Sequence, residues 1–359
     1  MSGKLCVVFA DAFSYRCYQK NGGLNFINHS YKLTPGIGYS SNLHHLIFSG
    51  NTPDDMDFFT DYGYVGPSKS RKMGKLYSLF DTCDTVNNFY RYLLHKLKIQ
   101  YDNIPFCERA AFQHNGVYKF IQPEDCYVFG RKVELICNHD IDVAFSQAMQ
   151  AINNRKEDLI VILEELDRLG HLHGSHSEQY EGYGNNILQR VDTFFKDYKS
   201  KYPDSICVFL SDHGMVDIHC GVDIIDSLYR HFGKPGDDYY FYNDSVYLRI
   251  WSESEAFRNC IADYLRGVDV LNYIDDNTRM RCGASKREHG DLIYWLKEGY
   301  MFNPNCFDIM LKSMPAGMHG YMEHSEDASG IVVLDRAIDN NEEISANDIY
   351  RLIADVIKV

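Results

Sequence analysis

The chain has 359 residues, with 36 Lys and Arg against 50 Asp and Glu, which gives a formal net charge of −14. Its apolar content of 45% and its 9 prolines exclude an intrinsically disordered protein. The length predicts two domains or one large α/β domain. The acidic balance disfavours binding to long DNA or RNA, which normally requires a basic surface.

The N-terminus and the cysteines predict a cytoplasmic protein without a membrane span. The first apolar run, residues 5–10, is too short for the core of a signal peptide or for a transmembrane helix. The 11 cysteines are odd in number, scattered and without a Cys-x-x-Cys pair, so free thiols are favoured over a disulfide framework. The sequence leaves the oligomeric state open.

Four short apolar runs predict buried parallel strands: Leu5–Ala10, Leu159–Leu163, Ile206–Leu210 and Ile331–Leu334. They lack polar alternation, as expected for strands covered on both faces. Between the second and third runs, residues 177–199 place apolar side chains three or four positions apart, which predicts an amphipathic helix. This order predicts an α/β fold with a mostly parallel central sheet flanked by helices.

Two long segments have a different character. Residues 54–145 are rich in Phe, Tyr, Asn and Asp, and residues 235–315 combine Tyr-rich stretches with short alternating runs. We interpret both as insertions into a single domain that spans residues 1–359. They are expected to cover the carboxyl edge of the sheet, where open α/β sheets bind ligands.

Aspartates and histidines follow the predicted strands. Asp11 comes directly after the first strand, Asp167 and His171 after the second, and Asp212 and His213 after the third. Asp and His four residues apart can meet on one helical turn, and the glycine after His213 permits a tight turn. Because the carboxyl ends of parallel strands share one edge of a sheet, these side chains could bind a common metal centre.

A further histidine, His319, lies between glycines shortly before the last predicted strand. Three other histidines, His173, His176 and His324, are alternative ligands near these motifs. Other roles stay open at this point, since Asp11 could simply cap a helix and a His-rich loop could simply be solvated.

A nucleophile candidate, Ser40, lies where a loop gives way to a helical apolar patch that ends at Ser49 and Gly50. A serine at a helix start faces backbone N–H groups and the positive end of the helix dipole, although a capping role is the alternative. Three Asp and three His could supply two sets of three ligands. Two metal ions can stabilise the attacking and the leaving oxygen of a phosphoryl transfer. A serine held by such an ion would be an alkoxide at neutral pH.

The ordered motifs resemble the alkaline phosphatase superfamily, and within it the type I phosphodiesterase/nucleotide pyrophosphatase branch. They are Asp11, Ser40 with Ser49-Gly50, Asp167-x-x-Gly-His171, Asp212-His213-Gly-Met and Gly-x-His319-Gly-Tyr, which together cover residues 5 to about 334. Each motif is weak alone, whereas five in this order are hard to obtain by chance.

The resemblance implies two ligand sets and a nucleophile. Asp167, His171 and His319 would bind one divalent ion, and Asp11, Asp212 and His213 would bind the other, which would also contact the nucleophile Ser40. Zinc is favoured by this Asp/His mixture, and manganese is the alternative. Ser40 would form a phospho-serine intermediate, with Ser41 as the reserve nucleophile.

The chain departs from the family pattern near the nucleophile. Many nucleotide pyrophosphatases have Asn three positions after the nucleophile, where this chain has Leu43. Asn42, or the backbone N–H of Ser41, is the expected substitute for contacting the phosphoryl oxygens. The segment after Gly50 also differs from the family, which leaves the substrate open.

The favoured function is a metal-dependent hydrolase of phosphodiester or pyrophosphate bonds, acting on a small diester or nucleotide-type substrate. Only Arg16 and Arg168 lie close to the motifs in sequence, so a diester is favoured over the more highly charged monoester. A phosphotransferase or phosphomonoesterase of the same superfamily is the alternative. A non-catalytic binding protein on this fold is disfavoured, because all six ligand positions are intact.

Overall fold

The structure is a computed structural model that describes residues 3–66, 111–114, 126–236, 238–306, 314–338 and 342–358. The chain forms two compact units. The central unit comprises Met1–Thr52, Tyr118–Asp217 and Pro315–Val359, and the second unit comprises Pro53–Val117 and Ile218–Met314. Chain segments far apart in the sequence therefore build each unit.

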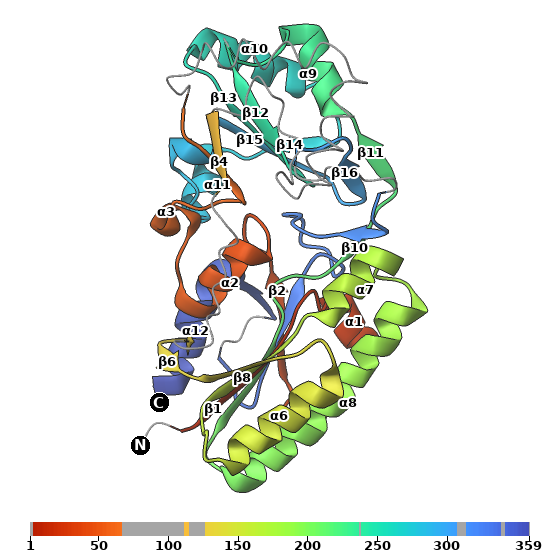
Figure 1. Ribbon diagram of the computed structural model, residues 1–359, viewed down its shortest axis with the longest axis vertical. Coiled ribbons are helices and arrows are strands. Elements are labelled where there is room, and N and C mark those ends of the chain that lie inside the picture. The colour runs from red at the N-terminus through yellow and green to blue at the C-terminus, as the bar shows by residue number, and fades with distance from the viewer. Residues whose placement is uncertain are drawn as a thin grey trace, which may run out of the picture. The chain divides into compact units, whose positions relative to one another are not determined.

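A seven-stranded sheet forms the middle of the central unit (Figure 1). In spatial order its strands are β19 (Glu343–Ser345), β2 (His29–Thr34), β18 (Gly330–Leu334), β9 (Ile206–Leu210), β1 (Leu5–Ala10), β8 (Leu159–Leu163) and β7 (Glu134–Cys137). Strand β1 pairs in parallel with both β8 and β9, and β7 extends the parallel set beyond β8. The predicted α/β fold with a mostly parallel sheet is confirmed.

Strand β18 is the exception to the parallel prediction, since it pairs antiparallel with both β9 and β2. Its apolar run located the strand correctly but did not indicate its direction. A strand that is buried on both faces has the same apolar pattern whether it runs parallel or antiparallel to its neighbours. The backbone N–H of Ser211, just after β9, donates to the carbonyl of Ile331 at the start of β18. The chain thus enters β18 from the carboxyl edge of β9, and this entry requires the reversed direction.

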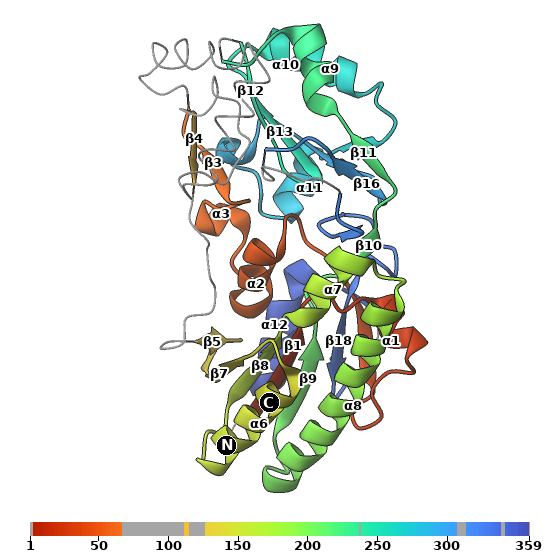
Figure 2. The ribbon, with the colours of Figure 1, turned by 45° about the vertical axis from the view of Figure 1, so that its right-hand side comes forward.

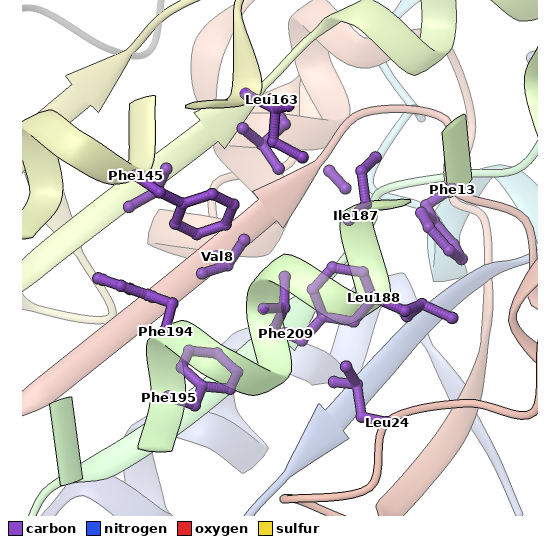
Figure 3. Packing of buried hydrophobic residues seen from close by; sticks show 14 of the residues in the cluster. Val8, Phe13, Leu24, Phe145, Leu163, Ile187, Leu188, Phe194, Phe195 and Phe209 are labelled. Carbon is purple, nitrogen blue, oxygen red and sulfur yellow. The ribbon is translucent and has the colours of Figure 1, made fainter. Parts of the chain in front are cut away.

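Helices cover both faces of this sheet (Figure 2). Along β1, Cys6, Val8 and Ala10 pack into one apolar cluster, and the alternate residues pack into another on the opposite face. The first cluster includes residues of α1 (Tyr15–Lys20), α6 (Ile141–Asn153) and α8 (Glu178–Lys201), and the second includes residues of α2 (Ser40–Ser49) and α12 (Ala346–Lys358). Figure 3 shows aromatic side chains of α6 and α8 beside Val8 and Phe209 of the strands. Helix α8 confirms the helix predicted over residues 177–199.

The first predicted insertion ends too late in the sequence. Residues 126–145 belong to the central unit, where β7 forms an edge of the sheet, after a small hairpin of β5 (Tyr127–Val128) and β6 (Arg131–Lys132). Strand β7 has only four residues, and their mixed burial hid it in the sequence. The second segment of the other unit begins earlier than predicted, at Ile218 rather than at residue 235.

The second unit contains a four-stranded antiparallel sheet in the order β12-β13-β15-β14. Its elements are α3 (Pro53–Met56), β3 (Tyr62–Tyr64), β4 (Phe112–His114), β11 (Cys220–Val222), α9 (Ile224–Phe232), β12 (Tyr240–Asn243), β13 (Tyr247–Trp251), α10 (Glu255–Leu265), β14 (Leu271–Tyr273), α11 (Asp276–Arg281), the 3-10 helix η2 (Arg287–His289), β15 (Leu292–Leu296) and β16 (Tyr300–Phe302). Its aromatic residues form an apolar core of their own. That this unit covers the active site stays a prediction.

The structure describes nine of the 11 cysteines, and all nine are free thiols. They are Cys6, Cys17, Cys126, Cys137, Cys207, Cys220, Cys260, Cys282 and Cys306. No helix within the described ranges is both long and apolar enough to cross a membrane. The cytoplasmic location stays a prediction.

Candidate metal centre and nucleophile

Ser40 is the first residue of helix α2, as the loop-to-helix pattern predicts. The helix ends at Gly50, whose φ of 74° is the left-handed conformation that favours glycine. The hydroxyl oxygen of Ser40 lies 2.8 Å from Nε2 of His213. The structure thus places the predicted nucleophile against a predicted metal ligand, and this contact favours Ser40 over Ser41.

Asn42 has a structural role at the start of helix α2. Its side chain is fully buried. Its Oδ1 accepts a hydrogen bond from the backbone N–H of Tyr39 at 2.8 Å, and its Nδ2 donates to the carbonyl of Ile37 at 2.6 Å. Asn42 therefore holds the turn that leads into Ser40, and a contact with phosphoryl oxygens stays a prediction.

Asp212 and His213 lie shortly after β9, where the chain bends, and both are buried. Their side chains meet, with Nε2 of His213 lying 3.2 Å from Oδ2 of Asp212. Gly214 allows a close approach to another segment of the chain, because a Cβ atom there would lie 1.9 Å from the backbone oxygen of Asp327. Nδ1 of His213 is 2.8 Å from the carbonyl oxygen of Gly214, so Nδ1 carries the proton and donates it.

Asp167 and His171 lie on helix α7 (Glu165–His173), which begins two residues after β8. They meet on one helical turn as predicted, with Nε2 of His171 3.4 Å from Oδ1 of Asp167. Nδ1 of His171 lies 2.8 Å from the carbonyl oxygen of Gly317. In both His171 and His213 a backbone carbonyl fixes the ring through Nδ1 and leaves Nε2 to face the carboxylates, as metal-binding histidines require.

His319 reaches the same place through a short strand pair. Strand β17 (Gly317–Met318) pairs antiparallel with β10 (Val216–Asp217), which brings the residue after Met318 beside the turn that follows β9. The ring of His319 stacks on that of His213 with their centroids 3.9 Å apart, and its Nε2 is 3.6 Å from Oδ1 of Asp167. Burial, followed by the charges of His213 and His171, holds the pKa of His319 well below its usual range. The neutral form that results is the one that binds metals.

The six predicted ligands therefore meet at one edge of the sheet. Asp11 completes the set, with its Oδ1 3.6 Å from Nε2 of His213. Donor atoms of Asp11, Asp212 and His213 lie within 4.8 Å of one another, as the resemblance implies. The other compact group is Asp167, His213 and His319, and Nε2 of His171 lies 3.4 Å from Oδ1 of Asp167. The assignment of His171 to the second ligand set stays a prediction.

This cluster has the donor chemistry of a divalent metal site. Oxygens of Asp11, Asp167 and Asp212 are buried without a hydrogen-bond partner, as is Nδ1 of His319. Burial and the neighbouring carboxylates of Asp212 and Asp167 raise the pKa of Asp11 well above its usual range. Burial would also raise the pKa of Asp212, but His213 and His44 outweigh burial and lower it. Buried carboxylates without partners are costly unless a cation joins them, and the residues present fit such a cation.

The alternative histidines lie outside this cluster. His173 is exposed at the end of α7, and His324 is exposed and paired with Glu343 at 3.0 Å. His176 bridges two other carboxylates, with Nδ1 3.1 Å from Asp217 and Nε2 3.6 Å from Asp327. Among the described residues, none of these three histidines belongs to a compact Asp/His donor group.

His44 is a residue of this site that the sequence reasoning missed. It lies on α2 four residues after Ser40, and its Nε2 is 3.3 Å from Oδ2 of Asp212. The available signal was its helical spacing from Ser40, since residues four apart share one face of a helix.

A second polar group in the central unit is tied together by Arg16. The guanidinium of Arg16 donates to Glu181, to Asp327 and to the carbonyl of Ser175. We call Arg16, Glu181, Asp327, His176 and Asp217 the Arg16 cluster. The other cation noted in the sequence, Arg168, pairs with Glu165 on the exposed face of α7.

The α/β sheet, the Asp/His cluster at its carboxyl edge and the serine at a helix start define a member of the alkaline phosphatase superfamily. The sequence model of the type I phosphodiesterase/nucleotide pyrophosphatase family matches residues 101–326, more than half of the chain. The chain therefore belongs to the type I phosphodiesterase/nucleotide pyrophosphatase family.

Solved structures with the same fold include murine and human ectonucleotide pyrophosphatase/phosphodiesterase 5. The murine protein aligns with a TM-score of 0.61 at 13% identity, over 99% of this chain and 95% of its own. Its inactive variant in complex with AMP gives a TM-score of 0.62 at 14% identity, and the human protein gives 0.59 at 12%, both with the same coverage. No curated protein matches the chain in sequence. At these identities the structural likeness shows the fold.

Proposed function

We propose that this protein hydrolyses phosphodiester or pyrophosphate bonds of small, nucleotide-type substrates at a two-metal site. One observation carries the proposal: the hydroxyl of Ser40 lies 2.8 Å from His213, at a cluster of three carboxylates with buried, unpartnered oxygens. Family membership supports the reaction class, because the family comprises phosphodiesterases and nucleotide pyrophosphatases.

Six side chains would hold two divalent cations, preferably zinc, with manganese as the alternative. Asp11, Asp212 and His213 would hold the cation next to Ser40, and the remaining ligands, Asp167, His171 and His319, would hold the other. When bound, such cations neutralise charge on phosphoryl oxygens and lower the pKa of an alcohol or a water molecule.

The nucleophile of the proposed reaction is Ser40. Its Oγ would lose its proton and form a bond to phosphorus, while the bond from phosphorus to the leaving oxygen breaks. A water molecule would then attack phosphorus from the opposite side, cleave the phospho-serine ester and restore Ser40. At the first position of α2, Ser40 lies beside backbone N–H groups that can bind an anionic phosphoryl oxygen. Asn42 keeps this helix start in place through its bonds to Tyr39 and Ile37.

The two arginines near the motifs are already paired with carboxylates, and this favours a diester substrate over a monoester. A monoester carries one more negative charge, which a free Arg or Lys beside the site would stabilise. Arg16 is occupied by Glu181, Asp327 and a backbone carbonyl, and Arg168 by Glu165. The structure of the murine relative with AMP supports a nucleotide-type substrate.

The activity test compares bis-p-nitrophenyl phosphate with p-nitrophenyl phosphate and p-nitrophenyl sulfate, on enzyme supplied with zinc. We expect the diester to be cleaved fastest and Ser40→Ala to lose at least about 10³-fold in kcat/KM. The matched control is Ser41→Ala, which should retain most of the activity. A strong monoester preference would overturn the substrate class, and full activity in Ser40→Ala would overturn the mechanism.

A further inference from the structure

His44 links the helix that carries the nucleophile to the turn that carries the buried ligand pair. It lies one helical turn after Ser40 on α2, and its Nε2 is 3.3 Å from Oδ2 of Asp212. The same carboxylate oxygen lies 3.2 Å from Nε2 of His213. Two imidazole nitrogens therefore approach one oxygen of Asp212 from different elements of the fold.

Aromatic neighbours fix the ring of His44. Phe9 of β1 contacts it edge-on, with ring centroids 4.9 Å apart and an interplanar angle of 87°. Phe48, one turn further along α2, lies at a centroid distance of 6.2 Å. The side chain of His44 is only 18% exposed. A ring packed in this way has little freedom to turn from Asp212, so the approach of its Nε2 is built into the packing.

The carboxylate of Asp212 and Nε2 of His44 are both buried polar groups in need of a hydrogen-bond partner. Asp212 is fully buried, and both of its carboxylate oxygens lack a hydrogen-bond partner. Nε2 of His44 is likewise buried without one. Since a buried polar atom without a partner costs about 1–3 kcal/mol, a small shift that aligns these two groups satisfies both.

We propose that His44 is a positioning residue that donates its Nε2–H to Oδ2 of Asp212. This inference rests on the proposed function of the site, in which Asp212 binds a divalent cation. A hydrogen bond from His44 orients the carboxylate so that its lone pairs point toward the cation, as partners of metal ligands do. It also keeps Ser40, on the same helix, in register with the cation that Asp212 holds.

Three substitutions separate this hydrogen bond from packing. His44→Leu keeps an apolar side chain against Phe9 and Phe48 but removes the donor. His44→Gln places an amide N–H near the position of Nε2, whereas the shorter His44→Asn places it near Nδ1. The matched control is His139→Gln, because the side chain of His139 is 83% exposed and lies 3.7 Å from Glu164.

The measurement is the zinc affinity of each metal-free protein, by competition with a chromogenic chelator, together with its thermal unfolding midpoint. We expect His44→Leu and His44→Asn to bind zinc about 10- to 100-fold more weakly than wild type, and His44→Gln to recover most of that loss. The number of ions bound at saturation should stay unchanged, whereas the unfolding midpoint of the metal-free protein should fall in His44→Leu and His44→Asn and largely recover in His44→Gln. His139→Gln should match wild type in every measurement. If His44→Leu does not fold, the Gln and Asn pair still decides the outcome.

Two results overturn the role of His44. One is wild-type affinity in both His44→Leu and His44→Asn, and the other is loss of a bound ion at saturating zinc in all three variants, which would make His44 a ligand. The proposed function fails differently, since wild-type protein would then bind no zinc or Ser40→Ala would stay active.

Discussion

Two groups of carboxylates and histidines in the central unit differ in how their carboxylates are paired. In the Arg16 cluster, Glu181 and Asp327 both accept hydrogen bonds from Arg16, and Asp217 accepts from Ser175 and contacts His176. In the Asp/His cluster, oxygens of Asp11, Asp167 and Asp212 are buried without a hydrogen-bond partner. The first group holds loops together by itself, whereas the second leaves buried carboxylate oxygens that a bound cation could satisfy.

The pKa values of Glu181 and Asp11 are shifted in opposite directions. Burial would raise the pKa of Glu181, but Lys20 and Arg16 outweigh it, and the pKa lies below its usual value of 4.5. For Asp11, burial and the neighbouring carboxylates act together and raise the pKa. Within the Asp/His cluster the direction varies, since His213 and His44 lower the pKa of Asp212, whereas burial and the neighbouring carboxylates dominate at Asp11.

The largest expected effect comes from removing a charge in the Asp/His cluster. Asp212→Asn should lower kcat/KM by about 10³-fold or more, because a buried ligand of the cation next to Ser40 is lost. The unfolding midpoint of the metal-free variant should fall, because His213 and His44 stabilise the charged form of Asp212. Full activity in Asp212→Asn would show that this carboxylate is not a ligand, and the contrast between the two clusters would disappear.

Breaking the Arg16 cluster should lower stability and leave metal binding largely unchanged. Arg16→Met leaves Glu181 and Asp327 without their shared partner, and it should lower the free energy of unfolding by about 2 kcal/mol, measured by urea denaturation. The zinc affinity of the folded variant should change little. Loss of zinc binding without loss of stability would instead assign Arg16 to the metal site.

The smallest effect is a pH dependence of opposite sign in the two clusters. The folded pKa of Asp11 is raised, so its favourable contribution is present below its usual value of 3.8 and is lost as the pH rises through the folded value. Asp11→Asn should therefore stabilise the metal-free protein at pH 7.5, by about 1 kcal/mol, and this gain should vanish toward pH 4. Glu181 has a lowered pKa, so its contribution is present above pH 4.5 and is lost as the pH falls through the folded value.

Glu181→Gln should consequently destabilise the metal-free protein at pH 7.5, and its effect should shrink at lower pH. Unfolding midpoints measured with a chelator present, between pH 4 and pH 7.5, test both variants. Equal signs for Asp11→Asn and Glu181→Gln would contradict the comparison.

Sequence patterns predicted the parts of this site that depend on local order. Buried strands have an unbroken apolar run, so β1, β8 and β9 and the ligands that follow them could be located. The start of α2 at Ser40 and its end at Gly50 follow from turn and cap chemistry. The positions of six ligands could therefore be named before any of their distances were known.

What escaped prediction depends on contacts between distant segments. The direction of β18, the capping bonds of Asn42 and the contact of His44 with Asp212 all require knowledge of what packs where. The engagement of Arg16 likewise joins residues more than 150 positions apart. A residue type and a spacing indicate a possible role, and only the packing decides between a cap, a positioning residue and a ligand.

Metal content is the most direct test of the central claim that the Asp/His cluster is a metal centre. Metal-free wild type and Asp212→Asn would be loaded with excess zinc, desalted and analysed for bound metal per chain. The account predicts about two zinc ions for wild type and fewer for the variant. Wild-type protein that retains no zinc, or a variant that retains as much as wild type, would contradict it.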